Sequence, residues 1–484
     1  MNIETGVLKP AETAELRHGD ARHPAESTQA IIARDKVAAP AWAASESYAY
    51  LGSDDITKDR YTEASFADGE FKRMWTRTWQ MACREDHVAE VGDYYVYDIG
   101  PYSFIVTRTG EDEIKAHFNA CLHRGTKLKP SASEGFANDI KCPFHGWTWN
   151  LDGSLKSIPE QWDFAHLTEK KMCLPQARVA RLGGFVWVNM DADAPSLEDY
   201  LGEEALSHLT AWKLEDRYIY LHVQKSYPAN WKLTMEAFME AYHVGDTHPQ
   251  VAPANGDVNS QYDVYGEHVD RFISTLGVVS PKLAGKYSEQ DIVDNFTMGD
   301  ASAMGGTKPQ LAEGQRARQV MADMFREMFE SAANTSLAHV SDTELLDTYS
   351  YTFFPNLFLF PGISLPMIYR FRPDARDHRR TIYEVMFMRP KPQSGHFETA
   401  SVEVLKDHQS FAEARGMDPG FGVILDQDTD NLYAQQEGLE ASAKPGLTLA
   451  NYQEIRVRHF EQAVDKYMAM APMVFDWARL QGSC

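Results

Sequence analysis

Long apolar runs and cysteines are scarce in this sequence, and both absences restrict the class of protein. No stretch approaches the roughly 18 uninterrupted apolar residues that a membrane-spanning helix needs. The polar start, Met1-Asn-Ile-Glu-Thr, lacks the basic and then apolar layout of a secretory signal. The chain has only five cysteines, and nothing in it indicates an oxidising compartment. We therefore expect a cytoplasmic protein that has no membrane partner.

Basic residues are also in deficit. The 484-residue chain has 47 Lys and Arg against 70 Asp and Glu, which gives a formal net charge of −23. Because nucleic-acid binding depends on basic patches, this balance disfavours nucleic acid as a partner. The densest basic stretch, residues 370–380, is interrupted by Asp374 and Asp377. We interpret it as a solvated turn, with a docking patch for an acidic protein as the alternative.

The first half of the chain changes from an irregular start to a β-rich section. Residues 1–45 show no sustained period and are expected to form a flexible arm. Apolar residues then recur at helical spacing over 61–79. Strand patterns follow over 92–100 and 102–108, and a last one over 180–189 closes this section. We therefore place a domain boundary near residue 192.

The second half has longer helical patterns, and no internal repeat or low-complexity tract is present. Residues 315–333 carry one face of Met and Phe, which we interpret as core. Residues 351–361 and 381–389 read as buried strands. The fold class is therefore α+β. We predict a flexible N-terminal arm (1–45), a helical segment that packs on the second domain (46–79), a β-rich first domain (80–192) and a larger second domain (193–484).

Two short cysteine–histidine pairs carry the first chemical signal. They are Cys121-Leu-His123 and Cys142-Pro-Phe-His145, and 18 residues separate them. Together they offer two thiolates and two imidazoles, which is the ligand set of a Rieske [2Fe–2S] cluster, with two cysteines on one iron and two histidines on the other. The sequence therefore predicts an electron-relay centre that these four residues bind.

Other uses of the four residues remain open at this point. The ligand types would also suit a structural zinc ion, although the spacing is not that of a Cys₂His₂ finger. A disulfide between Cys121 and Cys142 is a further alternative. The other cysteines, Cys83, Cys173 and Cys484, stand singly and are interpreted as free thiols.

A second metal-binding pattern follows the domain boundary. Glu236, Glu240 and His243 stand at i, i+4 and i+7, so they share one face of a helix. His248 would lie about 140° around the same helix, so both imidazoles reach one metal only if the helix ends between them. Gly245 and Pro249 supply such a break. The alternative is an ordinary amphipathic helix with Glu and His on its surface.

Two histidines and one carboxylate form the facial triad that leaves positions on Fe(II) open for dioxygen. Asp426, Asp428 and Asp430, near the start of a probable helix that reaches Leu439, are the candidate carboxylates, and the pattern does not choose among them. A calcium loop is the rival interpretation of these aspartates. It fails because Asn431 stands where the sharp turn of such a loop needs glycine.

Together these patterns closely resemble the catalytic α subunits of Rieske non-haem iron oxygenases, also called aromatic-ring-hydroxylating dioxygenases. The resemblance runs from about residue 61 to residue 439. Its most specific parts are Asn119-Ala-Cys-Leu-His-Arg-Gly125, Cys142-Pro-Phe-His-Gly-Trp-Thr-Trp149 with Asp152-Gly-Ser-Leu155, and Asn230-Trp-Lys232.

The resemblance implies a Rieske domain joined to a helix-grip catalytic domain that has an antiparallel sheet. It implies that His243, His248 and Asp428 hold the mononuclear iron, because Gln427-Asp-x₇-Gln436-x-Gly438-Leu439 matches the family pattern. Glu240 matches the carboxylate that connects the cluster of one subunit to the iron of the next. The chain departs from the family in two ways: Glu240 replaces the commoner Asp, and Ala237 stands where many relatives have Asn.

By the same resemblance the chain is a terminal oxygenase that hydroxylates an aromatic or related hydrophobic substrate with O₂ and electrons from a ferredoxin or an NAD(P)H-linked flavin reductase. The alternatives are a Rieske monooxygenase, which includes an O- or N-demethylase, and a non-catalytic electron-transfer protein. A homotrimer or an α₃β₃ assembly with a small β subunit is implied. Basic residues beside the first cluster loop are candidate contacts for the electron donor. Seven apolar residues are candidate pocket material, with core as the alternative: Phe238, Met239, Val244, Phe353, Phe354, Leu357 and Phe360.

Overall fold

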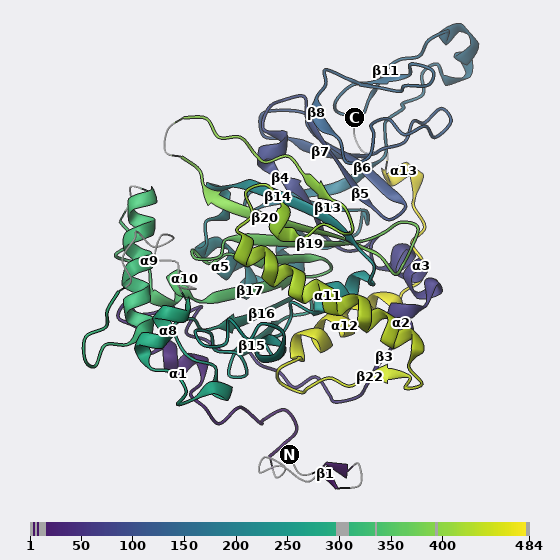
Figure 1. The fold of residues 1–484 in the computed structure, drawn as a ribbon. Helices are drawn as coiled ribbons and strands as arrows, with labels where there is room; N and C mark the ends of the chain where they lie inside the picture. The colour runs from purple at the N-terminus through teal and green to yellow at the C-terminus, as the bar shows by residue number, and fades with distance from the viewer. Residues whose placement is uncertain are drawn as a thin grey trace.

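The computed structural model describes residues 16–296, 309–333, 336–392 and 395–480, together with two short paired strands, β1 (Ile3–Glu4) and β2 (Val7–Leu8). Within these ranges, no helix has both the length and the apolar character that crossing a membrane requires. The described chain divides into a β-rich upper part and a larger lower part built on one broad sheet (Figure 1).

The β-rich part contains a seven-stranded antiparallel sheet and a small three-stranded sheet. The large sheet has the order β4-β13-β12-β7-β6-β5-β8, and β11-β10-β9 form the small one near the outer tip (Figure 1). The strands are β4 (Gln80–Arg84), β5 (Asp93–Ile99), β6 (Tyr102–Arg108), β7 (Ile114–Phe118), β8 (Glu134–Phe136), β9 (Ile140–Lys141), β10 (Thr148–Trp149), β11 (Leu155–Ser157), β12 (Gln176–Leu182) and β13 (Phe185–Asn189).

The single strand predicted over 180–189 is two strands. β12 and β13 form an antiparallel hairpin whose turn is Gly183-Gly184. Both glycines have left-handed backbone angles, with φ of 62° and 73°. Because side chains disfavour this region, the glycine pair reverses the chain where the apolar pattern alone suggested continuity.

The larger part is built on an eight-stranded sheet with the order β15-β16-β17-β18-β19-β20-β14-β21, antiparallel except for the β14–β21 pair. The strand predicted over 351–361 is again two strands. The strands are β14 (Arg217–Tyr227), β15 (Gln261–Tyr265), β16 (Val269–Ser274), β17 (Thr348–Phe353), β18 (Leu357–Phe360), β19 (Met367–Pro373), β20 (Thr381–Pro390) and β21 (Glu403–Leu405); β3 (Ile56–Thr57) and β22 (Gly446–Leu447) pair separately.

Helices α11 and α12 cross the sheet on the side that faces the viewer in Figure 1. The helix predicted over 315–333 is confirmed as α9. The α-helices are α1 (Thr28–Ile32), α2 (Asp59–Thr62), α3 (Ala64–Arg73), α4 (Leu197–Leu201), α5 (Glu203–Ala211), α6 (Trp231–Glu236), α7 (Val244–Thr247), α8 (Glu289–Phe296), α9 (Ala317–Ala333), α10 (Asp342–Leu346), α11 (Pro419–Ala441), α12 (Ile455–Met468) and α13 (Trp477–Leu480).

The segment expected to be a flexible arm is packed from α1 onward, so that expectation is wrong for residues 28–45. Asp35 forms an ion pair with Arg318 at 2.7 Å, and the Trp42 ring lies 4.9 Å from that of Trp212. The sequence pattern did not predict this packing, because the contacts come from individual side chains and not from a repeating apolar face. Most of residues 1–15 lie outside the described part of the chain.

The helix predicted over 61–79 ends at Arg73. Trp75 and Trp79 continue the helical spacing of apolar residues, yet they lie in a turn that leads to β4. Both side chains are almost fully buried. The apolar pattern therefore predicted correctly which side chains are buried, but it predicted the helical conformation correctly only as far as Arg73.

A buried ionic network joins the two parts of the chain. Arg370 on β19 forms an ion pair with Glu384 on β20 at 2.7 Å and donates a 2.6 Å hydrogen bond to the Ala82 carbonyl on β4. Arg372 also binds Glu384, at 2.9 Å, and donates to the Asp98 carbonyl on β5. The solvated turn predicted over 370–380 is therefore wrong at its first two arginines, which are strand residues that contact the β-rich part.

Candidate metal centres

The two Cys/His loops share the same pattern of backbone hydrogen bonds. In the first, the Gly125 N–H donates to the Cys121 carbonyl at 2.9 Å, and in the second the Gly146 N–H donates to the Cys142 carbonyl at 3.1 Å. Both glycines have positive φ, 77° and 72°. Because a side chain would strain these turns, glycine at these two positions is a structural requirement of the loops.

The loops bury the two thiols and leave the two imidazoles half-buried. Cys121 and Cys142 are free thiols and each is only 3% exposed, so the disulfide alternative is wrong. Burial and the adjacent Cys142 raise the pKa of the Cys121 thiol to about 11. The rings of His123 and His145 lie 4.6 Å apart, and the buried Nδ1 of His123 has no hydrogen-bond partner. The site thus offers a thiol pair and an imidazole pair on two sides.

The geometry argues against a single zinc ion in these loops. Among the described residues, only His243, His248 and Asp428 bring three ligand atoms within 4.8 Å of one another. A tetrahedral zinc site with bonds of about 2.0–2.3 Å would need that convergence. A two-iron cluster does not, because each iron takes one pair of ligands. The donor set and its layout therefore fit a Rieske cluster.

The remaining cysteines do not all follow the free-thiol interpretation. Cys83 is free and buried. Cys173 is disulfide-bonded, so the interpretation is wrong there. Spacing along the sequence gives no information about which thiols meet in the fold. Cys484 lies outside the described residues.

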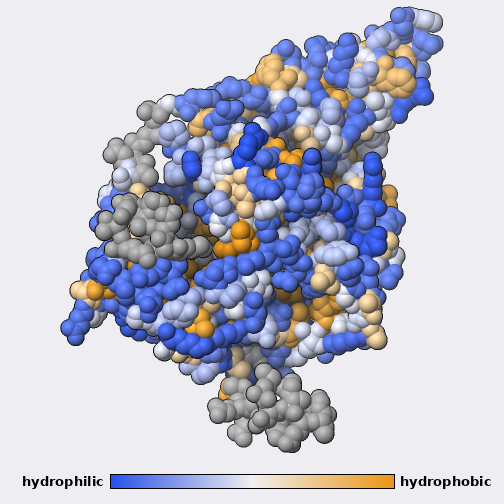
Figure 2. All heavy atoms as spheres, in the orientation of Figure 1, coloured by the Kyte–Doolittle hydropathy of each residue, from blue (hydrophilic) through white to orange (hydrophobic). Residues whose placement is uncertain are grey.

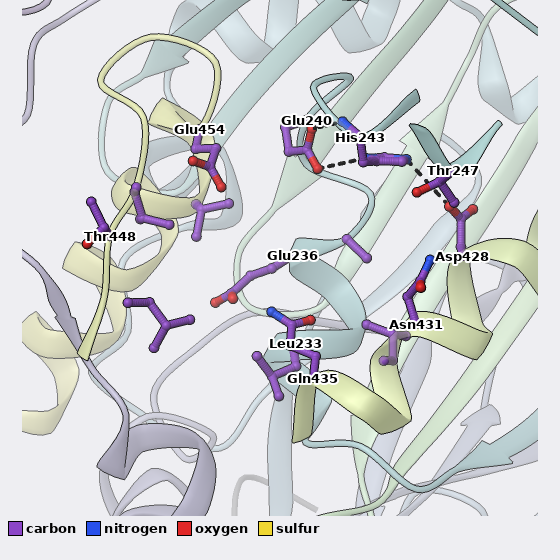
Figure 3. A pocket seen from close by; sticks show the side chains of 15 residues that line it. Leu233, Glu236, Glu240, His243, Thr247, Asp428, Asn431, Gln435, Thr448 and Glu454 are labelled. Carbon is purple, nitrogen blue, oxygen red and sulfur yellow. Dashed lines mark hydrogen bonds and ion pairs between the residues drawn. The ribbon is translucent and has the colours of Figure 1, made fainter. Parts of the chain in front are cut away.

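The second site joins two elements that are distant in sequence. His243 immediately precedes α7, His248 follows it, and Asp428 lies on the inner face of α11. The Asp428 Oδ1 atom lies 2.6 Å from His248 Nε2 and 3.5 Å from His243 Nε2. Figure 3 shows His243 and Asp428 facing each other across the edge of a cavity. All three side chains offer one ligand atom to a common point.

The break that allows both histidines to converge comes earlier than predicted. Helix α6 ends at Glu236, so Glu236, Glu240 and His243 do not share the face of one helix. A turn carries residues 237–243 before the short α7 begins. The expectation of one helix was wrong because spacing along the sequence gives no information about tertiary contacts. In the turn after α6, for example, the Ala241 N–H donates to the Tyr262 hydroxyl and not to a helical carbonyl.

The structure also distinguishes the three candidate aspartates. Asp426 accepts hydrogen bonds from the Ser410 hydroxyl and the Phe411 N–H, and therefore anchors a neighbouring loop. Asp430 is exposed on the outer face of α11. Asp428 alone of the three faces the histidines.

Each histidine is oriented by a second hydrogen bond from its other ring nitrogen. His243 Nδ1 lies 2.7 Å from the Glu240 carboxylate, and His248 Nδ1 lies 2.9 Å from the Gln427 side-chain oxygen. Such outer partners fix the ring orientation of metal-binding histidines. Gln427 was not predicted as a site residue, although its place directly before Asp428 was the available signal.

The charges of the second site suit a divalent cation. Burial lowers the pKa of His243, but hydrogen bonds to Asp428 and Glu240 outweigh it and raise the pKa to about 10. Burial raises the pKa of Asp428, and the two histidines lower it by more. A metal ion would take the place of the proton that the imidazole otherwise carries. Two imidazoles and one carboxylate leave coordination positions open, as the facial triad requires.

A cavity of about 400 Å³ opens beside the triad (Figure 3). Carboxylates of Glu236, Glu240 and Glu454 lie in its wall, and the described lining contains no lysine, arginine or aromatic residue. The seven apolar residues predicted as pocket material do not line it, so that reading is wrong and the core alternative holds: all seven are buried. The lining residues are Leu233, Glu236, Ala237, Glu240, His243, Thr247, Asp428, Asn431, Leu432, Gln435, Leu447, Thr448, Leu449, Glu454 and Val457.

The structure thus places a two-cysteine, two-histidine set in a β-rich domain and a two-histidine, one-carboxylate set beside a broad sheet. Comparison with protein families agrees: the family described as ring hydroxylating alpha subunit (catalytic domain) matches residues 203–470, and the Rieske [2Fe-2S] domain matches residues 78–168. The chain belongs to the ring-hydroxylating α-subunit family. Its two domains are of the kinds that bind a Rieske cluster and a mononuclear iron.

Relatives with known roles fall into two groups. The chain is 31% identical over 191 residues to the carnitine monooxygenase oxygenase subunit of Escherichia coli (strain K12), a match that covers 39% of this chain and 50% of the relative. It is 32% identical over 192 residues to the biphenyl 2,3-dioxygenase subunit alpha of Rhodococcus jostii (strain RHA1). That match covers 39% of this chain and 42% of the relative. The chain thus spans half or less of the length of these curated relatives.

Solved structures show the same fold. A quaternary ammonium Rieske monooxygenase in complex with L-carnitine matches with a TM-score of 0.58 at 18% identity, over 86% of this chain and 95% of that one. Naphthalene 1,2-dioxygenase from Rhodococcus sp. bound to indole matches with a TM-score of 0.57 at 20% identity, over the same shares. These structures therefore support the architecture alone.

Proposed function

We propose that this chain is the terminal oxygenase component of a multicomponent system, in which His243, His248 and Asp428 hold the mononuclear iron. The observation that carries the proposal is the convergence of these three ligand atoms, from segments about 180 residues apart, beside a cavity. When bound, such an iron supplies oxygen activation. The protein contributes fixed ligand geometry, through Glu240 and Gln427, and a shaped cavity for the substrate.

Cys121, His123, Cys142 and His145 would bind the cluster that delivers electrons one at a time. The donor is a ferredoxin or a flavin reductase that takes electrons from NAD(P)H. Its docking surface is the outer tip of the β-rich part, where Figure 2 shows apolar surface at the upper right. Phe144 in the second Cys/His loop (60% exposed) and Trp162 in the 3₁₀ helix Gln161–Leu167 (76% exposed) are exposed large residues of the β-rich part. By analogy with the family, the chains assemble as a trimer, with or without a small β subunit.

The acidic cavity favours a cationic substrate. Glu240 and Glu454 face the cavity, and aliphatic side chains form much of the remaining wall. An alkylammonium group suits such a site, because the carboxylates attract its charge and the aliphatic wall contacts its methyl groups. Hydroxylation of a carbon next to nitrogen inserts one oxygen atom, after which the carbon–nitrogen bond breaks to leave an aldehyde and an amine. The relationship to a carnitine monooxygenase subunit supports the insertion of one oxygen atom.

Hydroxylation of an arene is the second candidate. Biphenyl, anthranilate and naphthalene dioxygenase subunits are 32–34% identical to this chain over the matched segments. The purified oxygenase, supplied with an electron donor and ¹⁸O₂, should be tested against alkylammonium compounds, arenes and aryl ethers. We expect an aldehyde and a smaller amine from an alkylammonium substrate. A labelled cis-diol from an arene would instead establish the second candidate.

Replacing Glu454 by glutamine should raise KM for the alkylammonium substrate about tenfold, because a charge-assisted contact is worth about 1.5 kcal/mol or more. The kcat value should change little, since Glu454 does not contact the triad residues. Steady-state kinetics measures both constants. The matched control is Glu437→Gln, which removes an exposed carboxylate outside the cavity. An unchanged KM in the Glu454 variant would remove the support for a cationic substrate.

A further inference from the structure

A buried cluster of two carboxylates and one tyrosine lies beside the cavity and belongs to neither metal site. The Tyr61 hydroxyl lies 2.9 Å and 3.2 Å from the two carboxylate oxygens of Glu236, and 3.1 Å from Oε1 of Glu461. Glu461 is fully buried and Glu236 is 8% exposed. The single hydroxyl proton cannot satisfy two carboxylates at once, so a further proton is needed to stabilise the cluster.

Among the described residues, neither cation near this cluster forms an ion pair with Glu236. Arg60 on α2 binds Glu461 and Asp465, and Lys232 on α6 binds Glu70 on α3 at 2.6 Å. Burial raises the pKa of Glu236 well above its usual range, and Glu461 raises it further, while Tyr61 and Lys232 lower it by less. Burial beside a second carboxyl group therefore favours the protonated form of Glu236.

The cluster lies between the cavity and the ion pair of Arg60 with the exposed Asp465. Glu236 lines the cavity together with Glu240 and His243, and Figure 3 shows its carboxyl group directed into that space. A cavity of about 400 Å³ has room for several water molecules, each of which takes about 30 Å³ in the liquid. At the other end, Asp465 is 55% exposed and shares Arg60 with Glu461.

We propose that Glu236 supplies protons to the cavity during oxygenation and that Tyr61 and Glu461 hold it ready to do so. The proposal rests on the oxygenase function, in which insertion of one oxygen atom consumes two electrons from the reductase or ferredoxin and two protons per O₂, and releases one water. The proton leaves the Glu236 carboxyl oxygen for a cavity water and ends on the reduced oxygen. Glu236 is then reprotonated by solvent water that enters the cavity, while the Tyr61 hydroxyl keeps its own proton and its hydrogen bond to Glu236.

Infrared spectroscopy tests the protonation independently of turnover. The protein should show the carbonyl stretch of a buried protonated carboxylic acid at neutral pH, and Glu236→Gln should remove it. Glu437→Gln, an exposed glutamate on α11, should leave the band unchanged. If the Glu236 variant retains the band, the proposal is overturned, whereas the oxygenase function is untouched by that result.

Kinetics tests the role in the reaction. Glu236→Gln should lower kcat about 10²-fold, raise the solvent deuterium isotope effect on kcat and leave KM nearly unchanged, because general acid catalysis contributes about 10²–10⁴-fold. Tyr61→Phe should change the same quantities by less. Tyr433→Phe, which breaks an exposed tyrosine–glutamate pair on α11, is the control and should behave as the parent. A Glu236 variant with the parent's kcat and isotope effect would contradict the proposal.

Discussion

Substitution of Asp428 by alanine should reduce substrate turnover to background while the visible absorption of the iron–sulfur cluster stays intact. The reason is that the second site loses its only carboxylate ligand and the acceptor for both imidazoles, at 2.6 and 3.5 Å. Two histidines alone bind a divalent ion weakly compared with a complete facial triad. Metal analysis should therefore fall from about three irons per chain to about two, because a Rieske cluster contains two.

Asp430→Ala is the matched control for this experiment. It removes an aspartate from the same helix, but from the exposed face, and should keep both the iron content and the activity. If the Asp428 variant also lost the cluster absorption, the two metal sites would not be separate, and our assignment of the second site would be wrong.

The second large effect concerns stability. Replacement of Arg370 by methionine should lower the free energy of unfolding by about 3–5 kcal/mol, which is typical when one partner of a buried ion pair is removed. Arg370 is 2% exposed, and its loss leaves Glu384 buried with less positive charge. It also leaves the Met81 and Ala82 carbonyls without their donor. Urea denaturation, followed by tryptophan fluorescence, measures the change.

Arg379→Met supplies the comparison. Its side chain is 53% exposed and its ion pair with Asp377 is on the surface, so a loss below about 1 kcal/mol is expected. Equal losses in the two variants would show that burial of Arg370 between the two parts of the chain adds nothing to stability.

The sequence contained the local and chemical information about this fold, but little about long-range contacts. Alternation of apolar residues sufficed for β5 and β6, and one apolar stripe sufficed for α9. The same reasoning joined β12 and β13 into one strand, because the chain reversal depends on two glycine conformations. The same reasoning predicted that Arg370 is solvent-exposed, because the density of charge along the sequence does not show whether a residue lies in a buried strand.

The candidate site residues were predictable where only a few residue types can perform the chemistry. Few residues bind iron, so His243 and His248 followed from type and spacing alone, whereas Asp428 needed the family pattern. The cavity was not predictable, because Glu454 and Glu461 lie on segments more than 200 residues from α6 and carry no pattern that marks them. The contact of Tyr61 with the two glutamates could not be predicted either, since a single tyrosine in an apolar segment is usually a core residue.

The contact of Tyr61 with Glu236 and Glu461 also affects how the chain can be divided. The larger part of the fold is discontinuous in sequence: its first piece, α2 and α3, precedes the β-rich part, which is inserted between that piece and the rest. A fragment that began at residue 193 would leave the carboxyl groups of Glu236 and Glu461 facing the gap that Tyr61 fills. Exchange of the cluster domain with a relative would therefore need two crossover points, one on each side of the insertion.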